Sequence, residues 1–259
     1  MGVDFLKKII ANLLNLCLIL IAIFSFYKVY EKLKDYKKAD NTYSNLEEIY
    51  ENSIVEESSI SDITENSNTL SNNNTQSNNN NLYSINNDFK FWIKVDNTNI
   101  SYPVVQGIDN SFYLKNDFYK KKSSSGTIFI DYKNNYKEDK NVLIYGHNMK
   151  NKTMFANLEK FKNKGFFNQN NKIRIIEDGT EYIYEVFSVY YTNANNINLT
   201  YSFDNDSDFI SYINILKNKS LFKSNLTFDN DDKIITLSTC SYEGKDSRTI
   251  VHAKLISNS

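Results

Sequence analysis

The segment KIITLSTC (residues 233–240) is the stretch of this sequence that says most about its fold. Its apolar and β-branched residues predict a buried strand, and this strand ends on Cys240. A second segment with the same character, RTIVHAKL (248–255), begins eight residues after the cysteine with Arg248. The sequence therefore predicts two late strands, with a thiol at the end of the first and a guanidinium at the start of the second.

Cysteine, histidine and arginine are scarce in this chain, which has two of each among 259 residues. Cys17 lies in the apolar N-terminal segment, so the remainder of the chain holds Cys240 alone and no cysteine to pair it with. The simplest interpretation is a buried cysteine that acts as a small hydrophobe. The alternative is chemical, because a thiol with a guanidinium nearby and a histidine available is the minimum set for covalent acyl transfer.

His147 is the better candidate partner for the thiol. It follows the predicted strand 141–145 (NVLIY) and Gly146, a residue that allows a sharp turn at the end of a strand. His252 lies within segment 248–255, where a hydrogen-bonded structural histidine is the more usual role. The simpler interpretation of His147 is a surface loop histidine, which its sequence neighbours alone do not exclude.

Arg248 has a chemical and a structural interpretation. A guanidinium stays protonated and presents a planar set of donors, which suits a carbonyl oxygen that becomes an oxyanion. The structural alternative is a surface ion pair with Glu243 or Asp246 in the polar loop between the two strands.

Composition argues against several classes of function. The net charge is −1 with 24% charged residues, so a nucleic-acid partner is not expected. Carboxylates do not cluster with the two histidines, and only one cysteine lies outside the apolar segment, so no metal site and no cofactor are predicted. The 19 tyrosines and 17 phenylalanines, with Val, Ile and Thr, favour strands over helices.

The N-terminal part of the chain predicts a membrane anchor followed by a stalk. Residues 9–27 (IIANLLNLCLILIAIFSFY) are about long enough to cross a bilayer, and bulky residues stand where a signal peptide would be cleaved. We expect residues 1–8 in the cytoplasm and the chain after residue 27 outside the cell. Residues 28–55 have helical spacing, and the Ser/Asn-rich residues 56–86 predict a flexible spacer that holds a folded head away from the membrane.

Residues 87–259 read as a mainly β domain with short helical insertions, which is typical of a closed barrel or a sandwich. The predicted helices lie at 109–116, 153–161 and 207–219. The eight predicted strands are 91–95, 102–105, 127–130, 141–145, 173–176, 182–187, 233–237 and 249–255.

Three motifs together resemble the sortases, the membrane-anchored cysteine transpeptidases of Gram-positive bacteria. They are TLSTC (236–240), RTIVHAKL (248–255) and YGHNM (145–149), and the last looks most like class B. The resemblance covers about residue 87 to the C-terminus and implies a closed eight-stranded β-barrel with an N-terminal helix. The spacer looks long and the loop between Cys240 and Arg248 short beside some class B members, which bears on reach and substrate shape.

The resemblance also implies a mechanism. The Cys240 thiolate would attack the Thr carbonyl of a C-terminal sorting motif of surface proteins, of the type Asn-Pro-X-Thr. Arg248 would stabilise the oxyanion, and His147 would protonate the leaving amine and then deprotonate an amine from a lipid-linked peptidoglycan precursor. Calcium, which some class A sortases use, is not predicted. Three residues beside the nucleophile would contact substrate: Ser238, Thr239 and Ser241.

Two other functions remain open at this point. A membrane-anchored cysteine peptidase would use the same thiol and imidazole but pass the acyl group to water. A membrane-tethered binding module, rich in tyrosine at its interface, would need no chemistry at all. Replacing Cys240 with Ala separates the enzymes from the binding module, and product analysis with and without an amine separates the two enzymes.

Overall fold

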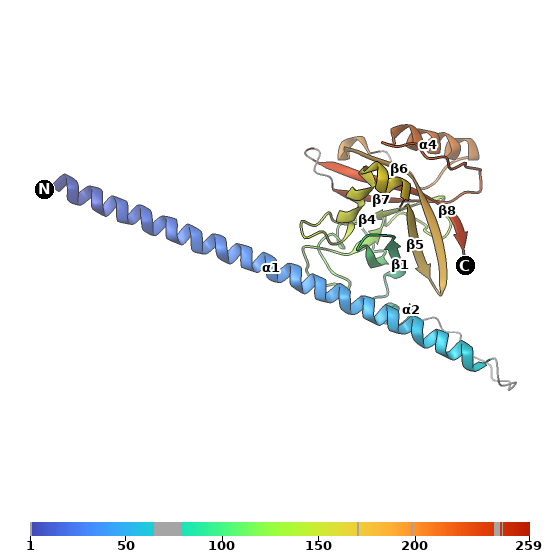
Figure 1. The fold of residues 1–259 in the computed structure, drawn as a ribbon, viewed down its shortest axis with the longest axis horizontal. Helices are drawn as coiled ribbons and strands as arrows, with labels where there is room; N and C mark the ends of the chain where they lie inside the picture. The colour runs from blue at the N-terminus through green and yellow to red at the C-terminus, as the bar shows by residue number, and fades with distance from the viewer. Residues whose placement is uncertain (1, 65–78, 170, 198, 241–243, 245) are drawn as a thin grey trace.

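The computed structural model describes residues 2–64, 79–169, 171–197, 199–240, 244 and 246–259. Eight strands close into a barrel in the order β1-β2-β3-β4-β7-β8-β6-β5, with β1 paired to β5, and a long helix runs past the barrel on one side (Figure 1). The pairs β2–β3 and β4–β7 are parallel and the others antiparallel. The strands are β1 (Phe89–Val95), β2 (Ser101–Val105), β3 (Ile128–Ile130), β4 (Asn141–Tyr145), β5 (Lys172–Glu177), β6 (Thr180–Asn193), β7 (Ile234–Cys240) and β8 (Ser247–Asn258).

The segment quoted first, KIITLSTC, forms β7, and its lack of polar alternation has a structural reason. β7 lies between β4 and β8, so both of its edges are paired. Ile235 and Leu237 belong to the main core, whereas Ile234 belongs to a second cluster beneath a helix on the outside of the barrel. A strand buried on both faces has no solvent side and therefore carries apolar residues throughout.

The structure confirms all eight predicted strands and the closed barrel. The largest difference is β6, which continues six residues beyond the predicted end at 187. Its second half pairs with the first half of β8, and the residues from Phe187 to Tyr190 are buried. The helices are α1 (Gly2–Thr64), α2 (Asn79–Ile85), the 3₁₀ helix η1 (Phe155–Lys162), α3 (Lys164–Gln169), the 3₁₀ helix η2 (Ala194–Asn196) and α4 (Asp206–Lys219).

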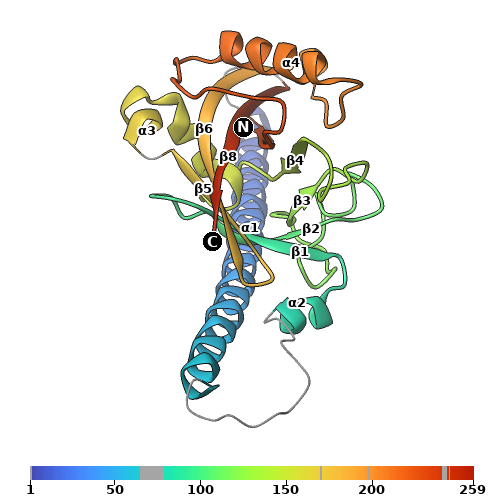
Figure 2. The same ribbon diagram turned by 90° about the vertical axis from the view of Figure 1, so that its right-hand side faces the viewer.

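Two of the three predicted helical insertions are confirmed. The segment 207–219 is α4, which begins after Asn205, whose side chain accepts a hydrogen bond from the Asp208 amide. Its apolar face, which includes Phe209 and Leu216, packs on the outer face of the barrel at β6 (Figure 2). The segment predicted over 153–161 is the 3₁₀ helix η1.

The helix predicted over 109–116 is wrong, and the reason lies in its backbone carbonyls. Tyr113 O accepts a hydrogen bond from the Thr127 amide, and Lys115 O accepts one from the Ser123 amide. Those carbonyls therefore serve a neighbouring segment and not the amides four residues ahead, as a helix requires. Residues 109–116 instead form a series of turns beside β3.

Part of helix α1 packs into the barrel's core, a contact that was not predicted for the helical stalk of residues 28–55. Tyr43, Leu46 and Tyr50 are buried, and the Tyr50 ring stacks on Trp92 with centroids 4.4 Å apart. The barrel therefore packs directly on this part of α1. α1 continues to residue 64, residues 79–85 form α2, and the remaining residues 65–78 lie outside the described part of the chain.

The N-terminal half of α1 carries one stretch that is long and apolar enough to cross a membrane. It has a mean hydropathy of 2.5, and none of it is buried against the rest of the chain. Because α1 is one continuous helix, this stretch is joined to the barrel-packed part around Leu46 without a break (Figure 1).

Candidate active site

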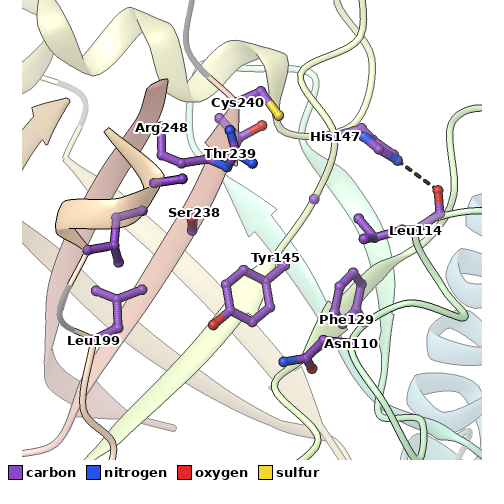
Figure 3. A pocket seen from close by; sticks show the side chains of 13 residues that line it. Asn110, Leu114, Phe129, Tyr145, His147, Leu199, Ser238, Thr239, Cys240 and Arg248 are labelled. Atoms are coloured by element: carbon purple, nitrogen blue, oxygen red, sulfur yellow. Dashed lines mark hydrogen bonds between the residues drawn. The ribbon is translucent and has the colours of Figure 1, made fainter. Parts of the chain in front are cut away.

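Strand pairing places Cys240 and Arg248 next to each other. Cys240 is the last residue of β7, Arg248 is the second residue of β8, and the antiparallel register sets the two directly opposite. The Cys240 side chain is exposed and forms no disulfide. Figure 3 shows the sulfur at the rim of a cavity, with Arg248 beside it. The interpretation of Cys240 as a buried small hydrophobe is therefore wrong.

His147 reaches the same rim from the neighbouring strand. β4 pairs with β7 in parallel, Tyr145 lies opposite Ser238, and the Gly146 amide donates to the Ser238 carbonyl at 3.2 Å. His147 follows at once and lies across the cavity mouth from Cys240 (Figure 3). Gly146 is needed for close packing rather than for a sharp turn, because a Cβ atom there would lie 2.8 Å from the ring of Phe155.

The imidazole of His147 is oriented by a main-chain carbonyl. Its Nε2 atom lies 2.7 Å from the carbonyl oxygen of Leu114. A carbonyl oxygen can only accept, so Nε2 carries the proton of this hydrogen bond and Nδ1 is the ring nitrogen left to exchange protons. The Leu114 carbonyl belongs to the turns of residues 109–116. The backbone arrangement that prevents a helix there also presents this acceptor to His147.

Arg248 does not form the ion pair that was its structural alternative. Its Nη1 atom donates to the Ser247 carbonyl at 3.1 Å, and it forms no ion pair with Asp246 or any other residue that the structure describes. Glu243, the other proposed partner, lies outside the described residues. The half-buried guanidinium lines the cavity next to Cys240.

The cavity between these residues has a volume of about 530 Å³. Ser238 and Thr239, which the resemblance implies as substrate contacts, line it, whereas Ser241 lies outside the described residues. The rest of the wall was not predicted from the sequence. These residues come from β3, β4 and the segments after β2 and β6, and no local pattern marks them: Asn110, Leu114, Phe129, Tyr145, Ala194, Ile197 and Leu199.

A buried carboxylate organises the polar end of the cavity. Asp131 Oδ2 accepts hydrogen bonds from Asn110 Nδ2 at 2.9 Å and from the Tyr145 hydroxyl at 3.1 Å. Burial raises the pKa of Tyr145, and the Asp131 charge raises it further, so the phenol remains a neutral donor. Two polar side chains of the wall are thereby held in one orientation before any ligand arrives.

His252 has the structural role expected of it. It is fully buried, and its Nδ1 atom lies 2.8 Å from Thr236 Oγ1, which in turn donates to Asn141 Oδ1. The His252 ring is also stacked against Tyr190. Burial, with a smaller effect from Lys219, lowers the pKa of His252 to about 3, so the ring is neutral in the folded protein.

Within the described part of the chain, no group of three or more His, Cys, Asp or Glu residues is placed to hold a metal ion.

A closed mixed barrel that brings a thiol, an imidazole and a guanidinium to one cavity defines a cysteine-dependent acyl-transfer enzyme. Residues 93–256 match the sequence family described as the Sortase domain. The chain belongs to the sortase family and is a cysteine transpeptidase.

Its relatives are class B sortases. Sortase B of Listeria monocytogenes is 37% identical over 179 residues, which is 68% of this chain and 72% of the relative. Sortase B of Staphylococcus aureus is 35% identical over 178 residues, or 68% and 73% of the two chains. The solved structure of Clostridium perfringens sortase B is 45% identical, with a TM-score of 0.68 over 69% of this chain and 99% of that one. A Staphylococcus aureus sortase B–substrate complex is 29% identical, with a TM-score of 0.73 over 85% and 97%.

Proposed function

We propose that this transpeptidase cleaves a C-terminal sorting motif of surface proteins after Thr, holds the acyl group as a thioester on Cys240, and passes it to an amine of a cell-wall precursor. The observation that carries the proposal is the register of β7 and β8, which sets Arg248 opposite Cys240 at the rim of the cavity. His147 lines the same cavity from the other side.

The first half-reaction forms the thioester. The Cys240 thiolate attacks the Thr carbonyl carbon, and the carbonyl oxygen becomes an oxyanion that the Arg248 guanidinium stabilises by hydrogen bonds. The carbon–nitrogen bond then breaks as His147 gives a proton to the leaving amine. Because Nε2 is held by the Leu114 carbonyl, Nδ1 is the atom that delivers this proton.

The second half-reaction restores the enzyme. The acceptor amine attacks the thioester carbon, His147 Nδ1 takes up a proton from the amine, and the carbon–sulfur bond breaks to release the Cys240 thiolate. The product is the surface protein joined to the precursor through a new amide bond. In the binding module considered above, Cys240 would have no such role.

The cavity supports a peptide ligand of mixed character. One part of its wall is apolar, with Leu114, Ile197 and Leu199, and the other presents the fixed Asn110 and Tyr145 side chains. This combination suits a short motif that has an apolar residue next to polar ones, such as Asn-Pro-X-Thr. Ser238 and Thr239 would contact the motif beside the scissile bond, with Ser241 adding its backbone amide to the oxyanion site.

We further propose that the apolar part of α1 anchors the enzyme in the cell membrane, with the N-terminus in the cytoplasm and the barrel outside. The apolar stretch of α1 supports the anchor, and Lys7 and Lys8 before it support this orientation. An anchored enzyme of this kind would meet a lipid-linked precursor amine at the membrane surface.

The test uses the full chain in a neutral detergent and quenched peptides that carry candidate sorting motifs. We expect cleavage after Thr, complete loss of cleavage in Cys240→Ala, and a loss of at least about 100-fold in Arg248→Ala. Arg248→Lys keeps the charge but not the planar donors, so its activity should stay well below that of the unchanged enzyme. With an amine acceptor present, the acyl product should be an amide in place of the free acid. A peptidase would release the free acid with or without the amine. Full cleavage by Cys240→Ala contradicts the proposal.

A further inference from the structure

A second cavity lies where the barrel meets α1, on the side of the barrel nearer to the apolar stretch. It is a groove of about 520 Å³ between α1 and residues 117–121. We call it the lysine groove, after the four lysines that line it: Lys34, Lys37, Lys38 and Lys121. Its other lining residues are Asn41, Thr42, Asn45, Asp117 and Tyr119.

The four lysines have no negative partner in the described part of the chain. All four are exposed, and none forms an ion pair with a described residue. The Asp117 carboxylate in the groove is 3% exposed and accepts a hydrogen bond from the Lys121 amide at 2.9 Å. Asp35 on α1 is engaged by the Ser124 hydroxyl. These two carboxylates therefore hold the loop in place, and the four lysine side chains line the groove.

Two contacts show how the loop beside the groove runs along α1. The Tyr43 hydroxyl donates to the Gly126 carbonyl, and the Ser124 hydroxyl donates to Asp35. Asp35 precedes Tyr43 by eight residues, so it lies about 12 Å nearer to the apolar stretch at 1.5 Å per helical residue. The loop therefore extends from the barrel toward the N-terminal end of α1.

The lysine groove begins close to the lipid headgroups if α1 crosses a membrane. The apolar run ends near Tyr27, and from there Lys34 is about 10 Å and Lys38 about 16 Å further along the helix. The polar layer on each face of a bilayer is about 5–8 Å thick beyond the hydrocarbon core. From Lys34, the groove lysine nearest to the membrane, a long and flexible side chain can span the remaining distance. Tyr119, 37% exposed in the same groove, has the amphipathic ring that is favoured at such an interface.

We propose that the lysine groove binds the phosphate group of anionic phospholipids in the membrane that α1 enters. This inference rests on the proposed membrane anchoring. Lysine ammonium groups bind phosphate as point charges, and one phosphate among four of them relieves the repulsion that they exert on one another. Because the groove lies to one side of α1, a bound headgroup would also fix how the barrel is rotated about the helix relative to the membrane surface.

The test compares lipid retention by full-length chains in nanodiscs that contain equal amounts of phosphatidylglycerol and phosphatidylcholine. After extraction into a neutral detergent, mass spectrometry measures the ratio of the two lipids that stay bound. We expect the unchanged chain to retain phosphatidylglycerol preferentially, and the triple variant Lys34→Gln, Lys38→Gln, Lys121→Gln to lose roughly tenfold or more of that preference. The matched control replaces Lys133, Lys164 and Lys223, three exposed lysines away from the groove, and should retain the preference.

Two results would overturn the inference. One is equal retention of phosphatidylglycerol by the unchanged chain and the groove variant. The other is binding of free glycerol phosphate, in phosphatidylcholine discs, as tight as the binding of the lipid, because the site would then recognise soluble phosphate and not the membrane. Peptide cleavage by the same samples separates this inference from the proposed function. If the unchanged chain cleaves the peptide but shows no preference for phosphatidylglycerol, only the inference about the lysine groove is rejected. If it shows the preference but does not cleave the peptide, only the proposed reaction is rejected.

Discussion

The side-chain amide of Asn148 donates a hydrogen bond from Nδ2 to the backbone carbonyl oxygen of Cys240, at 2.8 Å. Its Oδ1 atom is buried and has no hydrogen-bond partner among the described residues. Asn148 directly follows His147, so this bond ties the loop that carries the imidazole to the strand end that carries the thiol. We therefore expect Asn148 to be a positioning residue that fixes the separation of the two groups.

Replacing Asn148 with Ala should lower kcat for peptide cleavage by about tenfold with little change in KM, because the thiol and imidazole lose their fixed separation. The free energy of unfolding should fall by only about 1 kcal/mol, the usual value of one such hydrogen bond. Steady-state kinetics with a quenched peptide and urea unfolding measure the two effects. Asn151→Ala is the matched control, because the Asn151 side chain lies on the same loop but bonds only Thr153. Equal kcat values in the two variants would contradict the positioning role.

The hydrogen bond between His147 and the Leu114 carbonyl predicts an Nε2-protonated imidazole, which ¹⁵N NMR of the histidine ring detects directly. The bond can be disturbed from a distance through Gly126, whose φ is +58° and whose Cβ would lie 2.4 Å from the Tyr113 carbonyl oxygen. Gly126→Ala should therefore shift the backbone at residues 113–114, change the tautomer signal and lower kcat by roughly tenfold.

Gly165→Ala is the control for this substitution, because its Cβ would meet only the end of the Asn163 side chain. Should Gly126→Ala keep both the Nε2-protonated signal and the original kcat, the Leu114 carbonyl would not be what orients the ring.

Buried His252 predicts a loss of stability in acid. Its pKa of about 3 in the folded protein is below the ordinary value of 6.5, so the unfolded chain binds a proton that the folded chain does not. Its contribution to stability is complete above pH 6.5 and is lost as the pH falls toward 3. Between pH 6.5 and about pH 5 the loss should be about 2 kcal/mol.

Urea unfolding at these two pH values measures the effect, with His252→Gln as the comparison. The variant has no imidazole to protonate, so its stability should fall less over the same interval. If the free energy of unfolding fell equally in both proteins over this pH interval, His252 would already exchange protons freely in the folded state.

The burial of α1 side chains in the barrel predicts that this helix stabilises the catalytic domain. Leu46 is 0% exposed, and Leu46→Ala should reduce the free energy of unfolding by about 2–4 kcal/mol. Glu48→Ala, on the exposed side of the same helix, should change it by less than about 0.5 kcal/mol. Unfolding of the barrel, followed by the fluorescence of Trp92 beneath Tyr50, reports both. An unchanged midpoint in Leu46→Ala would mean that α1 does not belong to the barrel's core.

Much of the barrel could be predicted from local sequence, because its strands carry their own signals. Paired runs of β-branched and aromatic residues mark β1, β5 and β7, and all eight predicted strands are present. The prediction failed where tertiary partners decide the conformation. The second half of β6 is a strand because β8 pairs with it, and residues 109–116 are turns because distant amides take their carbonyls.

The candidate site divides in the same way. Cys240, His147 and Arg248 were found from rare residue types at strand ends and from the sortase motifs, and the structure places all three at one cavity. Apolar residues of the cavity wall, such as Phe129 and Ile197, could not be recognised from the sequence, because apolar side chains that line a cavity look the same in sequence as those in a core. Asn148 lies in the YGHNM motif, but no role was predicted for it. The neighbouring sequence does not show which backbone carbonyl its side-chain amide contacts.

The strands, the apolar stretch of α1 and the three candidate catalytic side chains could be predicted from the residues alone, because hydrophobic pattern and side-chain chemistry are properties of the residues. The packing of α1 into the barrel and the hydrogen bonds of His147 and Asn148 to the Leu114 and Cys240 carbonyls depend on the tertiary structure. Every residue has a backbone carbonyl, so which one is free to accept a bond, and from where, depends on the hydrogen bonds of the whole fold.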